Sequence, residues 1–213
     1  MIGLLGGIGA GKTAIAQHFA RLGCGVVDSD QMARRALETP SVQRILRQMC
    51  GPEVVRPDGT IDRRVLAEQV FSDPGKMEKL TSVVHPLVAG MRRRQMKMFA
   101  ADAKIKAIVW DSPLLLENHL ERFCDALVFV QTLASKRLAR VRQRQGWSRA
   151  QWAQREKLQM PLDKKKEMAD YIVDNNGEAV TSVHQVRRVF SQILAQQAAG
   201  PVEPNKAPVQ ALG

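Results

Sequence analysis

The stretch Gly6-Gly7-Ile8-Gly9-Ala10-Gly11-Lys12-Thr13 matches the pattern G-x-x-x-x-G-K-[ST] of phosphate-binding loops. An apolar run over 1–5 precedes it and predicts a short buried strand, and 14–22 carry apolar residues at helical spacing. A strand, a glycine-rich turn and a helix in this order direct backbone N–H groups and the positive end of a helix at an anion. The alternative, a turn that merely caps a helix, does not explain the full pattern in this context. The chain is therefore predicted to bind a nucleoside triphosphate.

Within this stretch each residue type has a chemical task. Lys12 is expected to reach the outer phosphates, and the Thr13 hydroxyl to ligate the Mg²⁺ ion that accompanies them. Asp111 ends an apolar strand, where it either supports the metal or caps the following turn, and both interpretations stay open. The predicted ATP-binding residues are Gly7, Ile8, Gly9, Ala10, Gly11, Lys12, Thr13 and Ala14, and the predicted metal residues are Thr13 and Asp111.

The amino-acid composition is that of an ordinary globular protein. The chain has 213 residues, of which 45% are hydrophobic and 25% charged, as in ordinary globular proteins. No apolar stretch approaches the ~20 residues of a membrane span, and the first strand leads directly into the loop rather than into a signal peptide. Three widely spaced cysteines, Cys24, Cys50 and Cys124, suit a reducing compartment better than a disulfide or zinc framework. We expect a cytoplasmic protein with no membrane partner.

The charge balance points to an anionic ligand. A formal net charge of +11 favours either nucleic acid or a phosphorylated small molecule. Aromatic residues make up only 5% of the chain, which leaves little for stacking on the bases of a nucleic acid. We therefore expect a small-molecule substrate and no nucleic-acid partner.

The order of the apolar segments predicts an α/β fold with a parallel five-stranded sheet flanked by helices. Between the second and third strands, the stretch 31–103 has helical patterns and turns but no convincing strand, which indicates a helical substrate-binding insertion. The predicted strands are 1–5, 25–28, 107–111, 126–130 and 171–174.

The second strand ends in two carboxylates, Asp28 and Asp30. We expect this strand to lie beside the first, so that both carboxylates share the carboxyl edge of the sheet, where ligands bind, with the phosphate loop. A kinase needs a carboxylate base when its acceptor is a hydroxyl, whereas an anionic phosphate acceptor needs none. Ser29 and Asp30 also offer helix-capping side chains before 31–37, so the residues alone leave Asp30 either as a base or as a cap.

The chain resembles the dephospho-coenzyme A kinase family over about residues 1–195. Beyond the phosphate loop, an Asp-x-Asp, a His-Pro and a Pro-Leu-Leu-x-Glu segment occur together in the family's order. The resemblance implies a P-loop nucleotide kinase fold with a mobile lid, and transfer of the γ-phosphate of ATP to the ribose 3′-hydroxyl of dephospho-coenzyme A. It rests on Gly3–Thr13, Asp28–Asp30, Asp58–Arg63, His85-Pro86, Pro113–Glu117 and Ala169–Gly177.

The resemblance also implies roles for individual residues. Asp30 matches the catalytic carboxylate of the family, and Arg140 and Arg144 fall where its lid carries phosphate-facing arginines. These arginines are one helical turn apart and so share a face. Leu5 stands where the family usually has Thr, and no role follows from the sequence for Trp147 or Trp152. The predicted catalytic residues are Asp30, Lys12, Arg140 and Arg144.

Several predicted substrate-binding residues have structural alternatives. Arg63 either holds a substrate phosphate or forms a surface salt bridge, and Glu117 either orients the acceptor or begins a helix. His85 is a ligand contact or, more in keeping with its place before Pro86, a hydrogen-bonded turn histidine. The predicted substrate-binding residues are Asp30, Arg63, His85, Pro113, Leu114 and Glu117.

We expect a single kinase domain over 1–197, forming a monomer or a weak homo-oligomer. Its core comprises 1–30, 104–134 and 170–197, with the helical substrate-binding region at 31–103, a lid at 135–169 and a disordered tail at 198–213. Two rival functions remain, another P-loop nucleoside or nucleotide kinase and a nucleotide-dependent switch or nucleic-acid ATPase.

Overall fold

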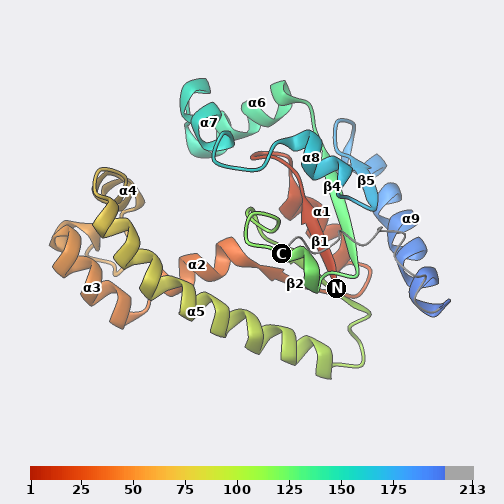
Figure 1. Ribbon diagram of the computed structural model, residues 1–213, viewed down its shortest axis with the longest axis horizontal. Coiled ribbons are helices and arrows are strands. Elements are labelled where there is room, and N and C mark those ends of the chain that lie inside the picture. Colours follow the sequence, from red (N-terminus) through yellow and green to blue (C-terminus); the bar gives the residue numbers. More distant parts are fainter. Residues whose placement is uncertain (200–213) are drawn as a thin grey trace, which may run out of the picture.

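The computed structural model describes residues 1–199, and a parallel five-stranded sheet forms its centre. Helices cover both faces of this sheet, and a helical arm projects from one edge (Figure 1). The predicted fold class is confirmed, and the predicted strand bounds agree to within one residue. The strands are β1 (Ile2–Leu5), β2 (Cys24–Asp28), β3 (Ala107–Asp111), β4 (Ala126–Gln131) and β5 (Tyr171–Asp174).

One helix separates β1 from β2, four helices separate β2 from β3, and three separate β4 from β5. The helices are α1 (Lys12–Ala20), α2 (Ser29–Leu37), α3 (Pro40–Cys50), α4 (Arg63–Phe71), α5 (Pro74–Ala101), α6 (Ala134–Gln145), α7 (Arg149–Glu156), α8 (Leu162–Glu167) and α9 (Ala179–Ala198). Two short 3₁₀ turns are also present, η1 (Pro52–Val54) between α3 and α4 and η2 (Glu121–Phe123) between β3 and β4. The first residue of the predicted tail ends α9, and 200–213 lie outside the described residues.

Alternation along the strands divides the core between the two faces of the sheet. Val128 and Val130 of β4 join one cluster with α1 and α9, whereas Leu127 and Phe129 face a second cluster containing Trp110. Side chains of successive strand residues point to opposite faces, which is why one apolar run serves both clusters.

The strand order corrects one expectation. The order is β2-β3-β1-β4-β5, so β3 lies between β1 and β2, and β2 does not lie beside β1. The crossover through α1 passes over one position in the sheet, and β3 fills it by pairing with both neighbours. In the resulting register Asp111 is level with Leu4 on one side and with Asp28 on the other. The last residue of β3 thereby becomes the bridge between the phosphate loop and the carboxylates after β2.

The segment between β2 and β3 builds a helical arm with a hydrophobic cluster of its own. Helices α3, α4 and α5 enclose this cluster, and the strand-like pairing there is an isolated bridge between Val55 and Ile61. The far half of α5 packs back against the sheet, where Gln95 Nε2 donates to the carbonyl of Val26 at 3.2 Å. A Cβ on Gly25 would lie 2.5 Å from the Phe99 ring, so glycine permits this close approach. The arm is therefore anchored directly at β2.

Two further observations bear on the sequence-based expectations. No helix in the described part of the chain is both long and apolar enough to cross a membrane. Cys24 and Cys50 are buried, Cys124 is half-buried, and all three are free thiols. Burial raises the pKa of Cys24 and of Cys124 to about 11, so both are inert thiols at neutral pH.

We predict that Phe19→Ala lowers the free energy of unfolding by about 3–5 kcal/mol, as truncation of a buried aromatic residue does. Phe19 is fully buried, and its ring meets Phe190 edge to face with centroids 5.9 Å apart. Urea denaturation measures the change. Phe123→Ala is the matched control, because that ring is 51% exposed and its loss should cost less than about 1 kcal/mol. Equal losses for the two variants would contradict the packing described for α1 and α9.

Candidate active site

The loop between β1 and α1 turns through glycines whose backbone angles other residues rarely adopt. Gly9 and Gly11 have φ of 80° and 91°. A Cβ on Gly9 would lie 2.6 Å from the carbonyl oxygen of Arg137, and one on Gly11 would lie 2.4 Å from Asn175 Nδ2. Gly11 is also the N-cap of α1, so the start of that helix opens toward the loop. The loop is thus a tight backbone turn suited to an anion.

Lys12 and Thr13 begin α1 and link the loop to β3. The Lys12 ammonium donates to the carbonyls of Gly6 at 2.9 Å and Gly7 at 3.2 Å. Burial lowers the pKa of Lys12, and the negative charge of Asp111 opposes part of that shift. The Thr13 hydroxyl donates to Asp111 Oδ2 at 2.8 Å.

Asp111 is buried, and burial raises the pKa of its carboxyl group against the opposing effects of Lys12 and the Thr13 hydrogen bond. Thr13 and Asp111 therefore place a hydroxyl and a carboxylate oxygen together beside the loop. Hard oxygen donors of this kind fit Mg²⁺, which usually takes one or two protein oxygens and completes its shell with phosphates and water. No group of three or more His, Cys, Asp or Glu residues that could form an all-protein metal site occurs within the described chain.

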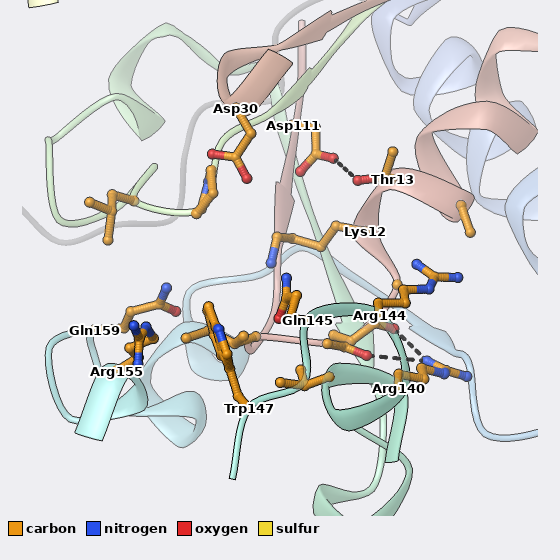
Figure 2. A pocket seen from close by; sticks show the side chains of 18 of the residues that line it. Lys12, Thr13, Asp30, Asp111, Arg140, Arg144, Gln145, Trp147, Arg155 and Gln159 are labelled. Carbon is orange, nitrogen blue, oxygen red and sulfur yellow. Dashed lines mark hydrogen bonds between the residues drawn. The ribbon is translucent and has the colours of Figure 1, made fainter. Parts of the chain in front are cut away.

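Asp30 lies in the first turn of α2, and its side chain points toward Lys12 and Asp111 (Figure 2). The N-cap of this helix is Asp28, whose Oδ1 accepts from the N–H of Gln31 at 2.9 Å. The capping role considered for Asp30 was therefore wrong, and Asp30 is left to face the cavity. Burial raises the pKa of the Asp30 carboxyl group, and the nearby charges of Asp111 and Asp28 raise it further.

A cavity of about 830 Å³ joins these residues, a volume that suits a small-molecule site. Its walls come from the phosphate loop, the first half of α2, the end of β3 with the turn after it, and the lid helices α6 and α7 with the loops that follow them. Of the predicted site residues, it brings together 8–14, Asp30, Asp111, Pro113, Leu114, Arg140 and Arg144.

The two predicted lid arginines are bound differently. The Arg140 guanidinium donates to the carbonyls of Ala10 at 3.0 Å and Asn175 at 3.1 Å, so it joins the loop to the segment after β5. Arg144 is exposed and lines the cavity. Both arginines are at the cavity, as their shared helical face predicts, but the Arg140 hydrogen bonds are to backbone carbonyls of the protein.

Four predicted site residues lie outside the walls of this cavity. Gly7 packs against the Arg137 guanidinium, and Arg63 is exposed at the start of α4 in the helical arm. His85 is exposed inside α5, which continues through Pro86, so the prediction of a turn histidine was wrong. An exposed imidazole on the outside of a helix has no turn to stabilise.

Glu117 neither begins a helix nor lines the cavity. Its Oε1 accepts from the Lys165 ammonium at 2.9 Å and from the Met160 N–H at 2.8 Å. Lys165 belongs to α8 and its side chain is only 2% exposed. The alternative that Glu117 starts a helix was wrong, because 113–119 form turns and the carboxylate is used to hold the end of the lid.

The lid helices are fastened to the tip of the phosphate loop by a second set of contacts. Buried Arg137 pairs with Glu156, stacks over the Trp152 ring at 4.9 Å and donates to the Ile8 carbonyl at 3.3 Å. Glu156 Oε1 accepts from the Ile8 N–H at 3.3 Å, and Trp152 Nε1 is 3.4 Å from the Ile8 carbonyl. We call Arg137, Trp152 and Glu156 the loop clasp.

The cavity also includes residues that the sequence analysis did not identify. Arg34 lies four residues after Asp30 on α2, a helical spacing that places both on one face and was an available signal. Arg155 and Gln159 have the same spacing along the lid, but the many basic residues there hide such a pair. The further unpredicted cavity residues are Val141, Gln145, Trp147 and Leu158.

Comparison with known proteins agrees with this architecture. A family model described as dephospho-CoA kinase matches residues 1–181. Curated dephospho-CoA kinases of Syntrophotalea carbinolica and Anaeromyxobacter dehalogenans are 37% identical over 198 residues and 36% identical over 212 residues. The first alignment covers 91% of this chain and 92% of the relative, and the second covers 99% of each. The crystal structure of TT1252 from Thermus thermophilus matches with a TM-score of 0.72 at 32% identity, over 90% of this chain and 96% of the other.

We predict that Lys12→Ala retains the fold and lowers turnover by far more than tenfold, since it removes a preorganised positive charge from the phosphate loop. Circular dichroism tests the fold and steady-state kinetics the turnover. Lys104→Ala, at an exposed position outside the cavity, controls for the loss of one positive charge and should keep parental activity. Turnover of the Lys12 variant within tenfold, about 1.4 kcal/mol in the barrier, would contradict the assignment of the loop.

Proposed function

The chain belongs to the dephospho-CoA kinase family, and from that premise we propose that its cavity transfers the γ-phosphate of ATP to the ribose 3′-hydroxyl of dephospho-CoA. The observation that carries this proposal is the position of Asp30. Its carboxylate is released from helix capping by Asp28 and faces Lys12 across the cavity. A carboxylate in that place suits a hydroxyl acceptor, which must lose a proton as it attacks.

The donor nucleotide is held by 8–14. Loop N–H groups and the N-terminus of α1 bind the phosphates, and Lys12 stabilises the negative charge that develops on the transferred group. Thr13 and Asp111 would hold Mg²⁺ through their oxygens. When bound, this ion neutralises charge on the phosphate oxygens.

Asp30 handles the acceptor. The 3′-hydroxyl oxygen forms a bond to the γ-phosphorus, the bond from that phosphorus to the bridging oxygen of ADP breaks, and the hydroxyl proton passes to the Asp30 carboxylate. The raised pKa of Asp30 makes this carboxylate a stronger base than an exposed one. Arg34, on the same face of α2, adds positive charge beside it.

The lid supplies charge and excludes water. Arg144 and Arg155 line the cavity from α6 and α7, and the loop clasp keeps these helices over the phosphate loop. Enclosure of this kind protects the γ-phosphate from hydrolysis. Arg140 holds the phosphate loop in place through its hydrogen bond to the Ala10 carbonyl.

One assay separates this function from its rivals. ADP release, measured by a coupled assay with and without dephospho-CoA, should depend on that acceptor, and mass spectrometry should find CoA as product. ADP release without any acceptor would favour a nucleotide-dependent switch or ATPase. Phosphorylation of nucleoside monophosphates in preference to dephospho-CoA would favour a nucleotide kinase.

A cytoplasmic location and a monomeric or weakly associating state belong to the same proposal. The three free thiols support a reducing compartment. The proposed substrate is a phosphorylated small molecule, which accounts for the net charge of +11 without a nucleic-acid or membrane partner.

We predict that Asp30→Asn lowers kcat by roughly 10²–10⁴-fold, the usual contribution of a general base, and leaves ATP affinity nearly unchanged. The same variant should unfold at a higher temperature at neutral pH. Folding raises the pKa of Asp30 above its ordinary value of 3.8. The folded protein therefore loses stability as the pH rises from 3.8 through the pKa of the folded state, because the folded state disfavours the ionised carboxylate. Asparagine removes this loss because it does not ionise.

Asp28→Asn is the matched control for that experiment. Asparagine caps a helix about as well as aspartate, so α2 should keep its start and its stability. Turnover, ATP binding and thermal unfolding are measured on both variants. Near-parental turnover of Asp30→Asn would remove Asp30 from the chemistry, while inactivity of the parent protein toward dephospho-CoA would reject the substrate itself.

A further inference from the structure

The cavity has an apolar side that phosphate binding does not explain. Trp147, Leu114 and Leu158 line the same space as Asp30 and the phosphate loop. Leu158 is 74% exposed and Leu114 is 41% exposed, so the hydrophobic core of the protein does not account for them. Apolar surface within a small-molecule site usually receives an apolar or aromatic part of the ligand.

Trp147 is held in a defined place within this surface. It follows Gly146, which ends α6 in a left-handed conformation, and precedes Ser148, which caps α7 with a full capping box. The Arg155 guanidinium stacks on its ring at 4.1 Å and also donates to the Gln151 carbonyl at 3.2 Å. The indole is half-buried, so part of it remains accessible from the cavity. An aromatic ring fixed on one side by a cation is a preorganised stacking surface.

The positions of the phosphate groups decide which nucleoside can reach that surface. In the proposed reaction the transferred phosphate lies between Lys12 and Asp30, and the donor follows the phosphate loop from there toward Thr13 and Arg144. The acceptor then occupies the remaining part of the cavity, which Asp30, Pro113 and Leu114 line. Figure 2 places Trp147 between Arg144 on one side and Arg155 and Gln159 on the other, with Asp30 facing them across the cavity. The acceptor's base is therefore the group within reach of Trp147.

We propose that Trp147 is a specificity-determining residue whose indole, held by Arg155 in a cavity that Leu114 and Leu158 also line, stacks on the adenine of the acceptor. The proposal rests on the proposed function, because it takes the acceptor to be an adenosine-containing molecule. It assigns the hydrophobic side of the cavity to the base and the charged side to the phosphates. Stacking recognises the flat face of the purine, whereas Asp30 recognises the hydroxyl.

Steady-state kinetics of two variants test this role. In Trp147→Ala the KM for dephospho-CoA should rise about tenfold, which corresponds to about 1.4 kcal/mol and falls within the range for stacking of one base on one aromatic side chain. The KM for ATP should stay within twofold, and Trp147→Phe should recover most of the loss because it keeps an aromatic plane. A rise in the KM for ATP alone would assign the ring to the donor and overturn the proposal. A loss of kcat at unchanged KM would reduce Trp147 to a support for Arg155 and overturn it as well.

Tryptophan fluorescence supplies a readout that does not require turnover. Dephospho-CoA added alone should quench the emission of the parent protein, and Trp147→Phe should abolish that quenching. Trp152→Phe is the matched control, because its indole is buried in the loop clasp and the quenching should persist. Quenching that survives in Trp147→Phe would overturn the proposal. If the parent protein fails to phosphorylate dephospho-CoA, the proposed function fails. If the parent protein phosphorylates it and the Trp147 variants keep the parental KM and quenching, only the present inference is rejected.

Discussion

The turn between β1 and α1 is the constraint on which the other parts of the site depend. Its glycines let the backbone reverse direction within a few residues, and they also let neighbouring segments approach the loop backbone closely. The Arg137 carbonyl and the Asn175 amide occupy the space that side chains at Gly9 and Gly11 would need. The loop is therefore held by the lid on one side and by the segment after β5 on the other. A turn with larger residues would lose both its own shape and these two supports.

This constraint concentrates charge at one edge of the sheet, at a cost in stability. Lys12, Asp30 and Asp111 lie close enough to influence one another. Burial lowers the pKa of Lys12 and raises the pKa of Asp30 and of Asp111, so it favours the neutral form of each. Desolvated charges of this kind are unfavourable for folding and valuable for catalysis, because they act in a low-dielectric space without waiting for solvent to reorganise. The large cores on both faces of the sheet offset this cost. Stability and catalysis thus place opposite demands on the same residues.

The sequence predicted the fold well because the fold rests on local patterns. Five apolar strands, the loop glycines and the helical insertion all leave signals within short windows, and the observed strands agree with them. Two of the features that the sequence missed depend on contacts between distant segments, namely the place of β3 between β1 and β2 and the pairing of Glu117 with Lys165. The capping of α2 by Asp28 is a local contact with Gln31, but Asp28, Ser29 and Asp30 are all residue types that cap helices, so the sequence did not single out Asp28. Arg63 and His85 belong to motifs whose side chains the helical arm keeps away from the cavity.

The lid contains two stacks of an arginine on a tryptophan, and the two stacks differ in burial and in role. Arg137 over Trp152 is buried and hydrogen-bonds to Glu156 and to the backbone of Ile8, so it holds the phosphate loop in a fixed position. Arg155 over Trp147 lines the cavity instead, where the same stacking leaves ring surface for a ligand. The proposed reaction requires both properties of the lid, because it must hold the loop and still leave room for the acceptor. The two tryptophans, without a role when seen only in the sequence, divide these tasks between them.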